Sequence, residues 1–160
     1  MDNPRKHEVL NKLDSSRKAL WSYLQALDEA GWETAVQSED AGWTVTDVVR
    51  HLVNAESGMT GNIEKIKIGE DPVPPDFDRE RYNKSRVRKT QHLTSADLLT
   101  QMETNRIHLL SVIDTLEDED WNKKGRHASL KIMTIEEFCH IIADHESWHL
   151  EEMKLATSKN

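Results

Sequence analysis

The pattern Thr-x-x-Asp/Glu occurs three times, each time directly ahead of a stretch whose apolar residues have helical spacing. The copies are Thr44-x-x-Asp47, Thr94-x-x-Asp97 and Thr134-x-x-Glu137. In a capping box of this kind, the threonine hydroxyl accepts a free N–H of the first helical turn, and the carboxylate accepts the N–H of the threonine. Three helices are therefore predicted to begin at these threonines.

Apolar residues at three- and four-residue intervals predict four amphipathic helices. The first covers about residues 5–29, and the others follow the three threonines. The stripe residues are Val9, Leu13, Leu20, Leu24 and Leu27; Val45, Val48, Leu52, Met59, Ile63 and Ile66; Leu98, Met102, Leu109, Ile113 and Leu116; and Ile135, Phe138 and Ile142. With 36% hydrophobic and 31% charged residues, the composition suits helices with solvated outer faces. We expect an all-α four-helix bundle that forms one domain over residues 1–160.

A connection of residues 68–93, containing Pro72, Pro74 and Pro75, separates the second and third helices. A segment this long can cross the end of a bundle, so these two helices need not be antiparallel. Its second half, residues 78–89, is expected to form a helical turn or two. Six basic residues lie there, but no aromatic residues alternate with them and the whole chain carries a net charge of −8. A nucleic-acid partner is therefore not expected.

The remaining bulk features predict a cytoplasmic protein without a membrane partner. The N-terminus lacks an apolar signal segment, and no apolar run approaches the roughly 20 residues of a membrane span. Cys139 is the one cysteine, so an internal disulfide is excluded, as is typical of a reducing compartment. On its helix Cys139 is expected to be a small buried apolar residue rather than a nucleophile.

His145 and His149 continue the apolar stripe of the last helix. Because they are four residues apart, their side chains lie one turn apart on the same face. Two imidazoles directed into a core need polar partners, and a shared metal ion satisfies both; hydrogen-bonded core histidines are an equally open interpretation.

His51 supplies a third imidazole if the second and fourth helices are antiparallel neighbours. It lies seven residues after Thr44, beside the stripe residues Val48 and Leu52. Three imidazoles with an open fourth position are typical of a catalytic metal site, and zinc, nickel, copper or iron would suit them. The other histidines (His7, His92, His108, His127 and His140) are expected to be solvated.

The segment from His145 to His149 also matches H-E-x-x-H, in which the glutamate of zinc proteases is the general base. Only eleven residues follow His149 and none is a histidine, which disfavours a protease. A di-iron site is disfavoured because both Glu-x-x-His motifs lie on one helix. Glu146 is nevertheless a candidate base towards metal-bound water.

Four short segments in order resemble the DinB/YfiT-like superfamily of metal-dependent bundles, which includes the N-terminal domain of mycothiol-dependent maleylpyruvate isomerase. They are residues 42–52 (GWTVTDVVRHL), 78–83 (DRERYN), 94–99 (TSADLL) and 140–149 (HIIADHESWH). The resemblance implies an up-down-down-up bundle and a metal held by His51, His145 and His149. It also implies low-molecular-weight thiols as co-substrates and homodimers. The isomerase branch has a glutamate at the position of His145, which puts that particular activity in doubt.

These observations favour a metal-dependent enzyme, either a thiol-dependent transferase or isomerase or a hydrolase, that binds zinc or nickel and acts on a small molecule. Candidate substrate contacts are Asn54, Glu56, Tyr82 and Asn83. Trp21, Trp43 and Trp148 could line a pocket, although packing in the core or at the bundle end is the expected role of tryptophans at such positions. The alternatives are a non-catalytic dimerisation or ligand-sensing module and a histidine cluster that binds no metal.

Overall fold

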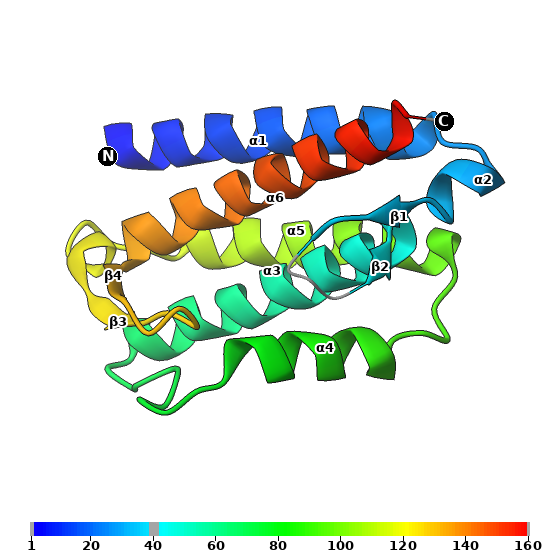
Figure 1. Cartoon of the computed structure of the whole chain (residues 1–160). Helices are drawn as coiled ribbons and strands as arrows, with labels where there is room; N and C mark the ends of the chain where they lie inside the picture. Colours follow the sequence, from blue (N-terminus) through cyan, green and yellow to red (C-terminus); the bar gives the residue numbers. More distant parts are fainter. Residues whose placement is uncertain (1, 39–41, 160) are drawn as a thin grey trace.

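Four long helices form the body of the protein in this computed structural model, which describes residues 2–38 and 42–159 (Figure 1). They are α1 (Pro4–Gln25), α3 (Val45–Lys67), α5 (Ser95–Asp114) and α6 (Ile135–Thr157). The shorter elements are α2 (Glu29–Trp32), β1 (Ala35–Val36), β2 (Trp43–Thr44), α4 (Arg79–Lys89), η1 (Asp120–Asn122), β3 (Lys124–Arg126) and β4 (Ile132–Thr134). The predicted all-α four-helix bundle is confirmed.

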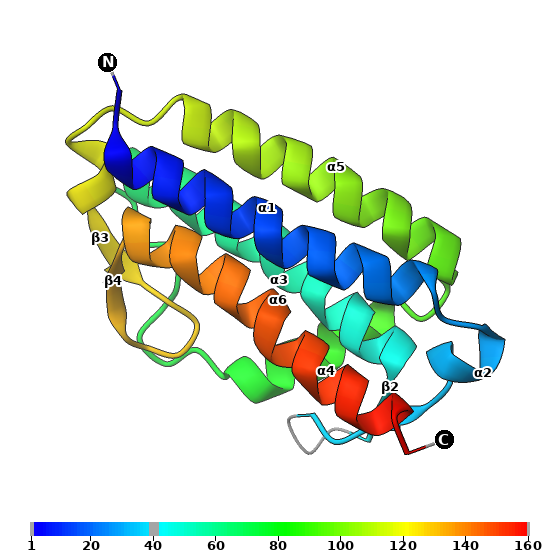
Figure 2. The same ribbon diagram turned by 90° about the horizontal axis from the view of Figure 1, so that it is seen from above.

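The helices run up, down, down and up (Figures 1 and 2). α1 and α6 run in one direction, and α3 and α5 run in the other. Because α4 in the long connection runs back along α3, the chain returns to the end where α3 began before α5 starts. Two antiparallel two-stranded ribbons, β1–β2 and β3–β4, complete the fold. This topology places α3 and α6 as antiparallel neighbours, which is the arrangement that a site shared by these two helices requires.

The three predicted capping boxes are all present. Thr44, Thr94 and Thr134 are the N-caps of α3, α5 and α6, and each box is closed in both directions. At α5, for example, Asp97 N–H donates to the Thr94 hydroxyl over 3.1 Å, while the Asp97 carboxylate accepts the Thr94 N–H over 2.9 Å.

Two helix boundaries differ from the sequence-based expectation. α1 ends at Gln25 rather than near residue 29, because Asp28 caps a separate short helix: its side chain accepts the Gly31 N–H over 2.7 Å. α4 is a full helix of 11 residues rather than a turn or two, and Asp78 caps its N-terminus. Within the described residues, no helix is long and apolar enough to span a membrane.

The core consists of two apolar halves stacked along the bundle axis. One half contains Leu13, Met59, Leu109 and Ile142, and the other contains Leu20, Leu52, Met102 and Leu150. Between these two levels each long helix contributes one charged residue, which is half-buried in the case of Arg17 and buried in the cases of Glu56, Arg106 and Glu146. We call this set the charged layer.

Replacing Thr94 by alanine removes the hydroxyl that accepts the Asp97 N–H. We expect the free energy of unfolding, measured by urea denaturation, to fall by about 1 kcal/mol. Thr104→Ala is the matched control, since Thr104 lies exposed within the same helix and alanine has the higher helix propensity. Equal losses in the two variants would contradict the capping role of Thr94.

Candidate metal centre

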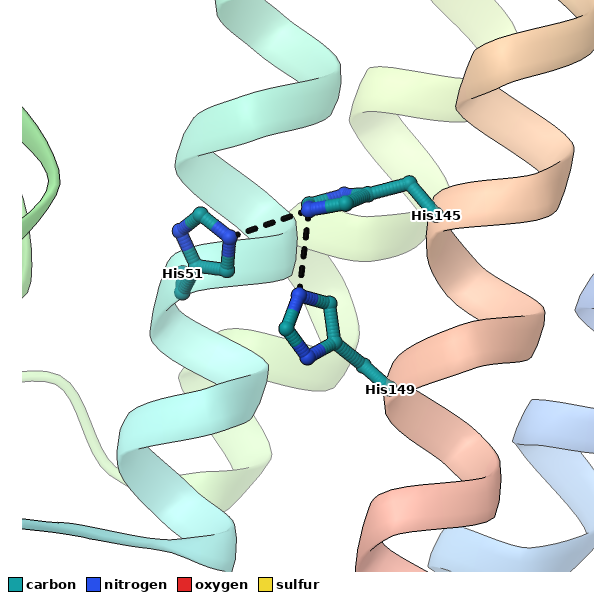
Figure 3. A group of neighbouring side chains, drawn as sticks. All are labelled: His51, His145 and His149. Carbon is teal, nitrogen blue, oxygen red and sulfur yellow. Dashed lines mark hydrogen bonds between the residues drawn. The ribbon is translucent and has the colours of Figure 1, made fainter. Parts of the chain in front are cut away.

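Three histidine side chains converge between α3 and α6 (Figure 3). His51 projects from the second turn of α3, and His145 and His149 project one turn apart from α6. The Nε2 atom of His145 lies 3.0 Å from Nε2 of His51 and 3.1 Å from Nε2 of His149. The three residues form a group whose potential ligand atoms all lie within 4.8 Å of one another. The antiparallel pairing of the two helices thus brings together the three histidines that the sequence singled out.

Burial keeps His51 and His145 neutral at physiological pH. His51 and His149 are 3% and 4% exposed. Burial, and after it the neighbouring His149 and Arg79, lower the pKa of His51 to about 3. The pKa of His145 is also held well below its usual value, first by burial and then by His149 and His51. Neutral imidazole is the form that binds a metal ion, so protons compete weakly for this site.

The spacing of the nitrogens suits a tetrahedral metal ion. Zn–N bonds are about 2.0–2.1 Å long, so two imidazole nitrogens on one tetrahedral zinc ion are about 3.3 Å apart. The two Nε2–Nε2 distances of 3.0 and 3.1 Å are close to that value. The potential ligand atoms of all three residues lie within 4.8 Å of one another, so one ion could be shared among them.

The other ring nitrogen of His149 has two oxygen neighbours. Nδ1 lies 3.2 Å from the Ser38 hydroxyl and 3.4 Å from a carboxylate oxygen of Glu152. A proton on Nδ1 can be donated to either oxygen, which leaves the Nε2 lone pair directed at the cluster. Metal-binding histidines are commonly oriented in this way. The ring of Trp43 packs against that of His51 with centroids 5.2 Å apart.

A cavity of about 620 Å³ opens onto the three histidines. Its walls are α3, the segment before α4, α4 itself, the turn between β3 and β4, and α6. Asn54, Tyr82 and Asn83, expected from the sequence to contact substrate, all line it. A small molecule in this cavity can therefore reach the histidine cluster.

Glu56 and Glu146 lie in the charged layer instead of in this cavity. The Glu56 carboxylate accepts hydrogen bonds from Arg17 Nη2 over 2.9 Å and Arg106 Nε over 2.8 Å. Glu146 accepts one from Arg17 Nε over 3.1 Å and also contacts Arg106 Nη2. Burial alone would lower the pKa of Arg17, yet Glu146 and Glu56 raise it above its usual value.

This placement differs from the surroundings expected for a substrate contact at Glu56 and a base at Glu146. Both carboxylates are bound by guanidinium groups, and neither residue lines the cavity. Adjacent residues on a helix point about 100° apart. Glu146 therefore faces another direction than His145, which the H-E-x-x-H motif alone does not reveal.

Other side chains also differ from their expected surroundings. His7, His92 and His108 are exposed, whereas His127 and His140 are half-buried. His127 lines the cavity, and its Nδ1 lies 2.9 Å from the Ser129 hydroxyl.

The tryptophans and the cysteine divide between the core and the cavity. Trp43 is buried as expected, but Trp148 is 56% exposed and lines the cavity, which corrects the packing role expected for it. Cys139 is buried as predicted, and burial raises the pKa of its thiol to about 12, which disfavours a nucleophilic role.

Comparison with known proteins finds related sequences. The sequence model of the DinB superfamily matches residues 12–153. The uncharacterized protein YuaE of Bacillus subtilis (strain 168) is 22% identical over 153 residues, which cover 88% of this chain and 92% of YuaE.

Two solved structures share the fold. YfiT from Bacillus subtilis, described as a probable metal-dependent hydrolase with an unusual four-helix bundle topology, superposes with a TM-score of 0.76 at 18% identity, covering 99% of this chain and 89% of YfiT. The mycothiol-dependent maleylpyruvate isomerase also gives 0.76, at 15% identity, covering 92% of this chain but only 60% of the isomerase.

The stability of the metal-free protein is expected to depend on pH through His51 and His145. Their folded-state pKa values lie below the unfolded value of about 6.5, so below that pH the unfolded chain binds protons that the folded chain does not. Between pH 6.5 and 5.0 the free energy of unfolding should fall by up to about 1.4 kcal/mol per pH unit for each histidine. Chemical denaturation in the presence of a chelator measures this slope.

The variant His51→Asn should have a shallower slope over the same range. His108→Asn, at an exposed position, should leave the slope unchanged. The assignment fails if both variants keep the slope of the parent.

Replacing Glu146 by glutamine leaves two buried guanidinium groups facing a single carboxylate. We expect a loss of about 3 kcal/mol in the free energy of unfolding, whereas Glu151→Gln at an exposed position of the same helix should change it by less than about 0.5 kcal/mol. A Glu146→Gln protein of parental stability would show that the charged layer does not hold this carboxylate.

Proposed function

The chain belongs to the DinB superfamily, and we propose that it is a metal-dependent enzyme whose divalent ion, zinc or nickel, is held by His51, His145 and His149. The observation that carries this proposal is the convergence of three imidazoles, two of them buried and one half-buried, at a cavity large enough for a small molecule. Structural zinc sites are usually closed by a fourth protein ligand, whereas catalytic sites keep one position open.

A bound divalent ion would supply a nucleophile near neutral pH, because it lowers the pKa of a water or thiol in its open position. The protein's own residues would do the rest. His149 is oriented by Ser38 and Glu152, and burial keeps the rings of His51 and His145 neutral. Asn54 and Asn83 can exchange hydrogen bonds with a substrate that enters the cavity, and Tyr82 supplies a hydroxyl.

Two reaction classes use a nucleophile generated in this way. YfiT is described as a probable metal-dependent hydrolase, and the maleylpyruvate isomerase depends on mycothiol. Water is the nucleophile in the first class and a thiol is the co-substrate in the second. We propose hydrolysis or thiol transfer on a small molecule for this chain.

A second candidate is a non-catalytic module that senses a small ligand. It is favoured by the charged layer, because the two buried carboxylates nearest the histidines are already bound by arginines and are not free to move protons. Among the described residues that line the cavity, Glu152 is the one carboxylate, and it contacts His149.

The proposal predicts about one divalent ion per chain in protein purified without a histidine tag and measured by plasma mass spectrometry. His145→Ala/His149→Ala should lose the ion, because two of its three ligands are removed. His92→Ala/His108→Ala, at two exposed positions, should keep it.

A metal-loaded parent should then hydrolyse a chromogenic ester or accelerate thiol addition to a fluorogenic halide, while the ligand variant should not. A parent that binds no ion even after reloading with zinc or nickel would refute the metal site. Stoichiometric metal without either activity would favour the sensing module.

A further inference from the structure

The charged residues that line the cavity are mostly basic, although the whole chain carries a net charge of −8. Lys65, Arg79 and Lys131 line it from three different segments: α3, the first residue of α4, and the turn that precedes β4. Among the described residues that line the cavity, Glu152 is the single acidic one. Its carboxylate already contacts Nδ1 of His149 in the histidine cluster. The cavity therefore has a local excess of positive charge in an acidic protein.

The three basic side chains make no hydrogen bond or ion pair with any residue in 2–38 or 42–159. Basic residues close by in the structure differ in this respect. Lys67 Nζ donates to the Thr115 carbonyl over 2.9 Å, and Arg126 Nη1 donates to the Asp71 carboxylate over 2.8 Å. Unpaired cations gathered at one cavity are available to a ligand, because binding it breaks no existing ion pair.

Arg79 is the first residue of α4 and lines the same cavity as the three histidines. Its side chain is exposed, as are those of Lys65 and Lys131, so a ligand that enters from solvent can reach all three. Arginine can also bind both oxygens of a carboxylate or phosphate at once.

We propose that the ligand of this cavity carries an anionic group, a carboxylate or a phosphate, which Arg79 binds with support from Lys65 and Lys131. This inference rests on the proposed function in one respect: it assumes that the reacting atoms of the same ligand face the histidine cluster. The exposed face of Trp148 and the side chain of Met133, which also line the cavity, would contact an apolar part of the molecule.

The test uses two probe anions, malonate and inorganic phosphate, titrated into the ¹⁵N-labelled full chain at constant ionic strength. Backbone amide shifts should saturate for residues around Arg79 and in the turn 127–131, with at least one of the two anions. A preference for malonate or for phosphate tells which anionic group the site accepts. Acetamide, which is neutral, should produce no saturable shifts.

The cavity variant Lys65→Met/Arg79→Met/Lys131→Met should bind the preferred anion about tenfold or more weakly. The control Arg81→Met/Arg88→Met/Lys89→Met removes the same charge from exposed positions of α4 outside the cavity lining and should bind like the parent. Equal weakening in the two variants would show that binding depends only on the net charge of the chain, which would contradict a site at Arg79. Amide shifts that never saturate would also overturn the proposal.

Metal content is measured separately on each sample, and the titrations are made with metal-free and with zinc-loaded protein. Saturable anion binding in a chain that takes up no metal would refute the metal centre and leave the anion site standing. A chain that holds zinc but binds neither anion would refute the anion site and leave the metal centre standing.

Discussion

The positions of the three histidines depend on the charged layer of Arg17, Glu56, Arg106 and Glu146. Each long helix contributes one member, and the layer separates the two apolar halves of the core. A charge left unpaired at such a depth is strongly destabilising. The four helices must therefore meet in the register that brings two carboxylates to two guanidinium groups, and the backbone carbonyls of Leu13 and Met102 accept further arginine hydrogen bonds in that register.

The metal centre follows from this register. Glu146 faces the bundle interior, so its neighbour His145 and the residue one turn further, His149, are turned towards α3. Glu56 has the same inward orientation on α3, and His51, five residues earlier, faces α6. The long connection completes the arrangement, because its return along α3 places α4 as the outer wall of the cavity. Stability and proposed chemistry thus use adjacent residues on opposite sides of the same helices.

Sequence reasoning succeeded where the signal is local. Capping boxes and apolar stripes gave the helix starts and the bundle, and the four-residue spacing of His145 and His149 identified one face of α6. It assigned Glu146 and Glu56 to the site because their distance along the chain from the histidines is small, whereas their partners Arg17 and Arg106 lie on other helices. Each member of the charged layer interrupts an apolar stripe, as Arg17 does between Leu13 and Leu20, and that interruption was the available signal.

The remaining cavity residues could not be found in this way. His127, Arg79 and Ser38 reach the histidines through turns and through the long connection, and no periodic pattern relates their positions to those of His51 and His149.

The most direct test of the account is X-ray absorption spectroscopy of the zinc-loaded protein. Three imidazole nitrogens at about 2.0–2.1 Å, with a further light-atom ligand that added thiol replaces by sulfur, are the predicted coordination. The His51→Ala protein should lose one imidazole from this set. A spectrum that shows four protein ligands, or a coordination that the loss of His51 does not change, would contradict an open metal site shared by α3 and α6.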